Sequence, residues 1–190
     1  MVYGSLAAGV FEETGRFLSF KLLRKRYGGI KPALSYGIGH GGIEAILVGG
    51  ISMISTIATS AMVNGGNAAT LTTGPNGEMV AKQLQALAET PSAMFLVAGA
   101  ERMFALTIHI ALSVIVFYAV YGKRRTWLYP AAILLHALID VPAALGQVGV
   151  ITNVLALEGL VLLSAVALAF LAVFTHRRLK REAEPVPDSI

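Results

Sequence analysis

Long apolar stretches that alternate with clusters of basic residues constrain this chain more than any other feature. A helix that crosses a bilayer needs about 20 mainly apolar residues, and five stretches meet that length: Val2 to Leu23, Ala33 to Val63, Pro91 to Tyr121, Trp127 to Gln147 and Val150 to Phe174. Only 14% of the residues are charged and the mean hydropathy is +0.69, whereas soluble domains carry about 25% charged residues. We therefore expect an all-α, polytopic transmembrane helical bundle with about five spans.

The basic residues predict the orientation of this bundle. Twelve of the 15 Lys and Arg residues fall in three clusters, at positions 21–31, 123–125 and 177–181. With five spans all three clusters lie on one side, which the positive-inside rule assigns to the cytoplasm together with the C-terminus. The basic excess is thus a consequence of topology, so we expect the lipid bilayer as a partner and no nucleic acid.

Domain organisation follows from the same pattern. Residues 1–175 are predicted to form one transmembrane bundle, with an outer-side loop and a short interfacial helix at about 64–90, and residues 176–190 a basic cytoplasmic tail. The first residues lack the charged start of a cleavable signal, so we expect the first helix to stay in the membrane. The chain has no cysteine, which excludes disulfides and thiolate chemistry.

Ionisable side chains inside the apolar stretches are the candidate functional residues. Each costs roughly 2.5–3.5 kcal/mol at the middle of a membrane helix on the insertion scale, so a large set is expected to pair around a polar cavity. The set comprises Glu12, Glu13, Arg16, His40, Glu44, Glu101, Arg102, His109, His136, Asp140 and Glu158.

Helical spacing groups these residues on four polar faces. Glu12 and Glu13 precede Arg16 by one turn, and three further pairs repeat at helical spacing: His40 with Glu44, Arg102 with His109, and His136 with Asp140. Counted from the basic clusters, the glutamates and histidines lie about 12–21 Å deep at about 1.5 Å per residue. The polar cavity is therefore expected in the cytoplasmic half of the membrane.

Three kinds of chemistry suit this constellation. A glutamate that takes a proton from water, with histidines that support the oxyanion, would hydrolyse a peptide bond. Neutral histidines and a carboxylate also form a zinc site, although the compact His-Glu-x-x-His signature is absent. Relays of carboxylates and histidines also serve proton- or ion-coupled transporters, which are not enzymes. Each side chain has in addition a purely structural interpretation as a hydrogen-bonding partner between helices.

Several separated motifs resemble one family. The motif Glu12-Glu13-x-x-Arg16, an aromatic Tyr36 four residues before His40, and His136-x-x-x-Asp140 resemble the CPBP superfamily of intramembrane glutamic proteases, which includes the type II CAAX prenyl proteases. The pairs His40/Glu44 and Arg102/His109 are more similar to its PrsW and YhfC branches, and the sequence from Gly39 to Ile46 is most similar to YhfC.

The resemblance implies a protease with a metal-independent mechanism and no cofactor, acting on a membrane-embedded or membrane-adjacent peptide in a bacterial or archaeal plasma membrane. Glu12 or Glu13 would activate the attacking water, with Arg16 fixing the glutamate pair. His40 would assist, and His136 and Asp140 would stabilise the oxyanion. Supporting roles fall to Glu44, Arg102 and His109.

This chain departs from the family pattern in two respects. The CAAX branch spaces its motif Glu-Glu-x-x-x-Arg, one residue longer than here, so both glutamates remain candidates for the base. The family usually has helices before the glutamate motif, whereas Glu12 lies close to the first residue of this sequence. A truncated copy, a minimal member and a homo-oligomer are the interpretations that we carry forward.

Overall fold

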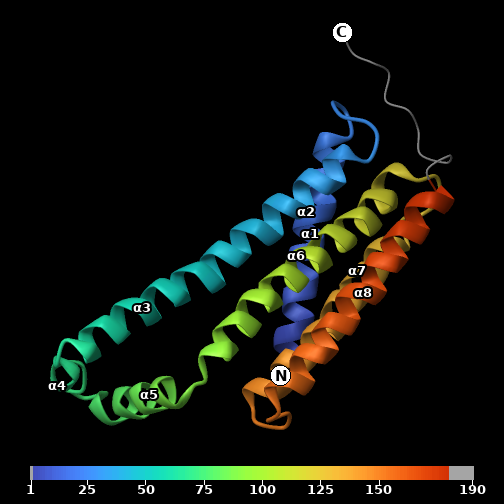
Figure 1. The fold of residues 1–190 in the computed structure, drawn as a ribbon. Coiled ribbons are helices and arrows are strands. Elements are labelled where there is room, and N and C mark those ends of the chain that lie inside the picture. The colour runs from blue at the N-terminus through green and yellow to red at the C-terminus, as the bar shows by residue number, and fades with distance from the viewer. Residues whose placement is uncertain (1, 180–190) are drawn as a thin grey trace. The chain divides into compact units, whose positions relative to one another are not determined.

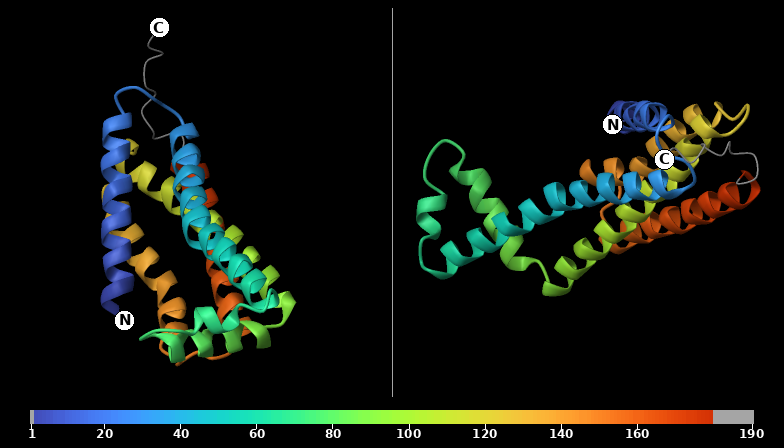
Figure 2. Two further views of the ribbon diagram at one scale, coloured as in Figure 1. Left: turned by 90° about the vertical axis from the view of Figure 1, so that its left-hand side faces the viewer. Right: turned by 90° about the horizontal axis from the view of Figure 1, so that it is seen from above.

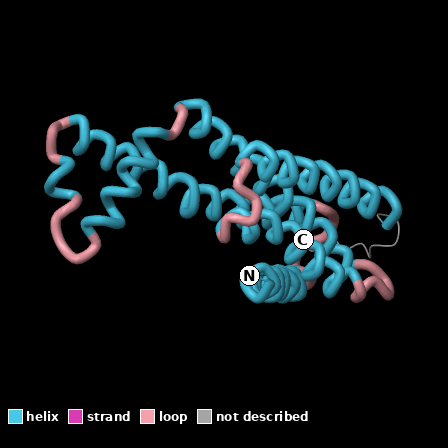
Figure 3. Tube along the Cα trace, turned by 90° about the horizontal axis from the view of Figure 1, so that it is seen from below, coloured by secondary structure: helices cyan, strands magenta, loops and turns pink. Residues whose placement is uncertain are grey.

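The computed structural model describes residues 2–179, which form helices and connecting loops without a strand (Figure 3). Figure 1 labels the helices along the chain. Their bounds are α1 Val2–Leu23, α2 Lys31–Glu44, the π-helical segment η1 Ala45–Gly50, α3 Ile51–Asn64, α4 Ala68–Leu71, α5 Gly77–Glu89, α6 Ser92–Tyr121, α7 Leu128–Gln147 and α8 Val154–Leu179.

Four helical stretches in the described part of the chain are long and apolar enough to cross a membrane: Lys31–Asn64, Ser92–Tyr121, Leu128–Gln147 and Val154–Arg178. The helix predicted at 2–23 forms with those bounds as α1. It differs from the other four because Glu12, Glu13, Arg16 and Lys21 lower its hydropathy. The prediction of an all-α polytopic membrane bundle is confirmed.

Three details differ from the expectation. The helix predicted at 33–63 is interrupted by the π-helical turn Ala45–Gly50. The region at about 64–90, where one short helix was expected, contains two, Ala68–Leu71 and Gly77–Glu89. The last helix continues to Leu179, so His176 belongs to α8 and not to a tail. Nδ1 of His176 lies 2.8 Å from the Tyr118 hydroxyl. The basic residues that follow His176 in the sequence did not indicate this contact. The rest of the predicted tail, residues 180–190, lies outside the described residues.

The chain divides into two compact units, of which the first comprises Met1–Ile43 and Met103–Ile190. Its core is the second half of α6, where every residue from Ile108 to Tyr121 is buried except Ile110. Helix α1 packs along α7 (Figure 2). The Phe17 and Tyr129 rings stack at 4.4 Å, and the Thr14 hydroxyl lies 2.7 Å from that of Tyr129. This packing fixes the face of α1 that carries the glutamates.

A glycine brings α2 close to α6 in the same unit. A Cβ atom added at Gly37 would lie 2.5 Å from the Cα atom of Ile110, and one at Gly41 would lie 3.1 Å from Cβ of His109. No larger residue fits at Gly37 without moving a backbone, since real Cβ atoms do not approach so closely. The close approach places His40 of α2 beside His109 of α6.

The described members of the three basic clusters lie at one end of this unit. The connection from α1 to α2, the connection from α6 to α7 and the last turn of α8 all occur there (Figure 1). The arrangement agrees with the distribution that the positive-inside rule requires of one membrane side.

The second unit, Glu44–Arg102, consists of η1, α3, α4, α5 and the first turns of α6. Nearly all its side chains are exposed or half-buried. Within it the stem of Arg102 packs on Gly49, where an added Cβ would lie 3.1 Å from the Arg102 side chain. Apolar side chains exposed on a membrane helix are suited to lipid contact.

Candidate functional site

Two consecutive residues of α1 carry carboxylates that point in different directions. Successive residues of an α-helix are rotated by about 100°, so Glu12 and Glu13 occupy different surroundings. The Glu13 side chain is completely buried, whereas that of Glu12 is 30% exposed. The two carboxylates therefore lie in different surroundings and contact different groups.

Glu13 is enclosed by a buried network with Arg16 and His136. The Nη1 atom of Arg16 lies 2.5 and 2.6 Å from the two carboxylate oxygens of Glu13, and both side chains are completely buried. Nδ1 of His136 lies 2.7 Å from Oε1 of Glu13. In the ion pair with Arg16 the oxygens of Glu13 accept hydrogen bonds, so we assign Nδ1 of His136 as a donor to Oε1. This contact leaves Nε2 of His136 outside the network around Glu13.

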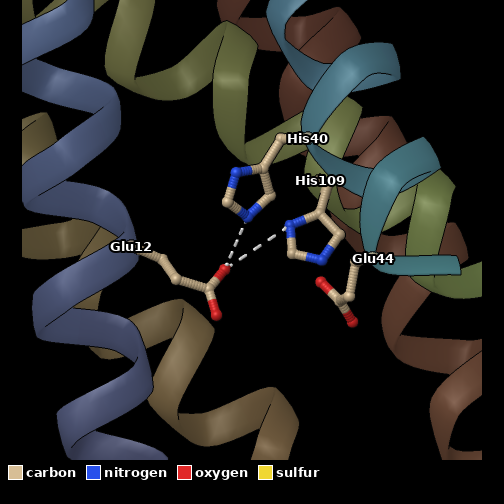
Figure 4. A group of neighbouring side chains, drawn as sticks. All are labelled: Glu12, His40, Glu44 and His109. Atoms are coloured by element: carbon tan, nitrogen blue, oxygen red, sulfur yellow. Dashed lines mark hydrogen bonds and ion pairs between the residues drawn. The ribbon is translucent and has the colours of Figure 1, made fainter. Parts of the chain in front are cut away.

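Glu12 faces a second group, which includes two histidines (Figure 4). Its Oε2 atom lies 2.9 Å from Nε2 of His40 and 3.9 Å from Nδ1 of His109. One potential ligand atom from each of these three residues lies within 4.8 Å of the others. We call Glu12, His40 and His109 the donor cluster. It brings together helices α1, α2 and α6.

Arg16 also contacts the donor cluster. Its Nη2 atom lies 3.2 Å from Nδ1 of His109, which is buried. A guanidinium only donates hydrogen bonds, so Nδ1 of His109 accepts here. An ion bound at this nitrogen would replace the hydrogen bond from Arg16.

His136 connects the two groups. Its Nε2 atom lies 3.8 Å from Oε2 of Glu12 and 3.7 Å from Oδ2 of Asp140, one turn further along α7. The imidazole is thus oriented through Nδ1 by Glu13 while Nε2 faces two carboxylates. A histidine held in this way can accept a proton at Nε2 and donate it again.

Aromatic rings form one wall around His40. The Tyr36 ring lies nearly parallel to that of His40 at 5.9 Å, and Phe20 packs against Tyr36 at 5.3 Å. The Tyr36 ring limits the orientation of His40 on one side, and Phe20 supports the Tyr36 ring. The predicted aromatic residue one turn before the histidine therefore has a structural role that the spacing alone did not define.

Comparison with known proteins agrees with these motifs. Residues 1–161 match the family described as YhfC intramembrane metalloprotease. The chain belongs to the YhfC family. Over 181 residues it is 39% identical to the uncharacterized membrane protein YhfC of Bacillus subtilis (strain 168), an overlap of 95% of this chain and 68% of that protein. No solved structure matches the chain significantly.

The predicted similarity to YhfC is confirmed, and the family description supports an intramembrane protease that resides in the membrane. Seven predicted site residues of this YhfC member lie in one connected set within the first unit: Glu12, Glu13, Arg16, His40, His109, His136 and Asp140. The described contacts of Arg16 join it to Glu13 and to His109.

Of the remaining predicted residues, Glu44, Glu101 and Arg102 lie at the start and end of the second unit, and Glu158 lies on α8 of the first unit. Arg102 forms ion pairs with Glu101 and, at 3.9 Å, with Glu44. Glu101 and Arg102 are adjacent in α6, and helical spacing does not predict a pair between adjacent residues. Glu44 ends α2 one turn after His40 (Figure 4), and so shares the face of α2 that carries that histidine.

The donor cluster has the composition of a zinc site. Two imidazoles and a carboxylate make up the protein ligands of one class of zinc hydrolases, which leave a further position open. The three donors of this YhfC member come from three helices and are half-buried or buried. Ligating histidines usually bind a second group through their other nitrogen. The residues present therefore fit the metal that the family description implies.

Proposed function

We propose that this protein is a metal-dependent intramembrane endopeptidase whose ion is held by Glu12, His40 and His109. The observation that carries the proposal is the convergence of these three donors within 4.8 Å. The family description as metalloproteases favours this mechanism over the metal-independent one expected from the sequence.

The metal would supply chemistry that the side chains lack. When bound by two histidines and a carboxylate, zinc makes water a stronger nucleophile at neutral pH and polarises a peptide carbonyl. The protein then has to hold the substrate peptide, orient the donors and move protons. Those tasks fall to residues whose positions are described above.

Glu12 is the carboxylate that we assign to the reaction site. Both oxygens of Glu13 are bound by Arg16 and one also by His136, and its side chain is completely buried. A carboxylate so occupied has no oxygen available for water or metal. The part of Glu13 is to position His136, and Arg16 holds the Glu13 carboxylate in place through both of its oxygens.

We assign the proton transfers to His136. With Nδ1 donating to Glu13, the free lone pair lies on Nε2, which faces Glu12 and Asp140. Nε2 would accept a proton from water that attacks the peptide and return it to the leaving amine. Asp140 would stabilise the imidazolium that forms between these two steps.

The substrate class follows from the surroundings of the site. The donor cluster lies within helices that are predicted to cross the membrane, so we propose a membrane-embedded or membrane-adjacent peptide as substrate. The basic ends of the helices support a cytoplasmic C-terminus and a site in the cytoplasmic half of the membrane.

The experiment is cleavage of a fluorogenic membrane-peptide library by the purified protein in liposomes. We expect cleavage that is lost after treatment with a strong chelator and restored by zinc, and that is lost permanently in His40→Ala. His176→Ala is the matched control, because this histidine lies in α8 and bonds to Tyr118 outside the donor cluster. Cleavage that survives complete removal of metal would contradict the proposal and favour the metal-independent glutamate mechanism.

A further inference from the structure

A cavity lies at the basic end of the first unit, and none of its lining residues belongs to the donor cluster. Its volume is about 400 Å³, within the roughly 300–1,000 Å³ typical of small-molecule sites. It is lined by the second half of α6, the start of α7, the last turns of α8 and the connection before α7. We call it the basic-end pocket.

The interior of the basic-end pocket is apolar. Ile115 and Leu128 are buried at its floor, and Leu171 and Phe174 of α8 line it while remaining 39% and 58% exposed. A cavity whose apolar wall is also part of the exposed surface of a membrane helix is accessible from the hydrocarbon region of a bilayer. The shape therefore suits a hydrocarbon chain that enters from the side.

Two arginines line the same cavity. Arg125 precedes α7, and its stem packs on Gly122, where an added Cβ would lie 3.0 Å from Cγ of Arg125. Arg178 extends from the last turn of α8 and is exposed. Among the residues that the structure describes, the lining of this pocket includes no acidic side chain. Guanidinium groups bind phosphate oxygens in a bidentate manner, so the charge of this rim is complementary to a phosphodiester.

Trp127 marks the depth of the pocket. It lines the cavity, is 60% exposed and is the single tryptophan of the chain. Tryptophan is enriched at the level of lipid headgroups, where its ring is apolar and its N–H remains hydrated. Arginines, an interfacial tryptophan and an apolar interior thus follow the order of headgroup, interface and acyl chain in a lipid monolayer.

We propose that the basic-end pocket binds an anionic glycerophospholipid. Its phosphate contacts Arg125 and Arg178, and part of one acyl chain fills the space between Ile115, Leu128 and Leu171. Basic pockets between membrane helices on the cytoplasmic side recognise anionic lipid headgroups by this combination of charge and apolar volume. The site is independent of the proposed proteolysis, because none of its lining residues belongs to the donor cluster or to the Glu13 network.

The single tryptophan provides the test. The protein is reconstituted in vesicles of phosphatidylcholine and phosphatidylglycerol in which one lipid carries brominated acyl chains, and quenching of Trp127 is measured for each labelled lipid at equal mole fraction. For the wild type we expect stronger quenching by brominated phosphatidylglycerol than by brominated phosphatidylcholine. Each of Arg125→Gln and Arg178→Gln should lower the relative affinity for the anionic lipid about fivefold, the factor that corresponds to ~1 kcal/mol per basic residue.

Two further variants distinguish a specific lipid site from general attraction of anionic lipids to the basic surface. Arg177→Gln removes the same charge one residue earlier on α8, but Arg177 does not line the pocket, so the preference should persist. Ala131→Leu fills the apolar part and should reduce the preference while both arginines remain. Equal quenching by the two lipids would overturn the proposal. So would a preference that survives in both arginine variants, or one that falls equally in Arg177→Gln.

Discussion

Replacing Glu12 with glutamine is expected to reduce peptide cleavage at least about a hundredfold while the helices remain folded. Changes to groups that merely support a metal ligand cost about 10–100-fold in affinity or activity, and loss of a ligand costs at least as much. Oε2 of Glu12 lies 2.9 Å from His40, 3.9 Å from His109 and 3.8 Å from His136. The amide keeps the volume and removes the charge. The measurement is the initial cleavage rate in liposomes.

The matched control for this variant is Glu78→Gln. Glu78 lies on α5 with a side chain that is 86% exposed and pairs with Lys82 at 2.9 Å. We expect a cleavage rate within twofold of the wild type, because exposed ion pairs contribute about 0–1 kcal/mol. The assignment of Glu12 would be wrong if Glu12→Gln retained most of the activity while a folded Glu13→Gln protein lost it.

The second large effect concerns stability. Arg16→Met is expected to lower the free energy of unfolding by about 3–5 kcal/mol, because it leaves the carboxylate of Glu13 buried without its counter-charge. Methionine retains an apolar stem of similar length, so most packing of the side chain is preserved. Arg16 and Glu13 are each completely buried, and the cost of removing one partner is therefore not reduced by solvent. Chemical denaturation in a mild detergent measures the loss.

Lys82→Met is the control for the charge removed. It breaks the exposed ion pair with Glu78 and should change the free energy of unfolding by no more than about 1 kcal/mol. A loss of equal size in the two variants would mean that the Arg16–Glu13 pair stabilises the bundle no more than a surface pair. The double variant Arg16→Met, Glu13→Leu should recover much of the lost stability, since it removes the buried charge altogether.

Much of the fold could be predicted from the sequence because a bilayer allows few solutions. Apolar stretches must form helices whose backbone groups hydrogen-bond within the helix. The basic clusters then indicate which ends of the helices face the cytoplasm. The helix at 2–23 and the ends of α5 and α7 follow directly from these rules. The π-helical turn Ala45–Gly50 could not be predicted, because no residue type requires it. The end of α8 was placed too early, since the contact of His176 with Tyr118 joins residues 58 positions apart.

The sequence predicts which ionisable residues lie within the membrane helices, but not which of them contact one another. The high cost of charge in lipid identified the ionisable residues, and helical spacing grouped them by face. Which glutamate faces the histidines depends on the rotation of α1, which Phe17 and Tyr129 fix by stacking across to α7. His109 was expected to have only a supporting role. It lies in the donor cluster because Gly37 and Gly41 allow α2 to approach α6 closely. Such approaches between distant segments leave no periodic pattern in the sequence.

Equilibrium zinc binding tests the central claim most directly, because it requires no knowledge of the substrate. Metal-stripped protein in detergent is titrated with zinc, and the bound ion per chain is counted for the wild type, Glu12→Gln, His40→Ala, His109→Ala and the control His176→Ala. We expect one tightly bound ion in the wild type and in His176→Ala, and affinity weakened at least about tenfold in each of the other three. A wild type that binds no zinc, or one whose affinity is unchanged by all three substitutions, would contradict the account.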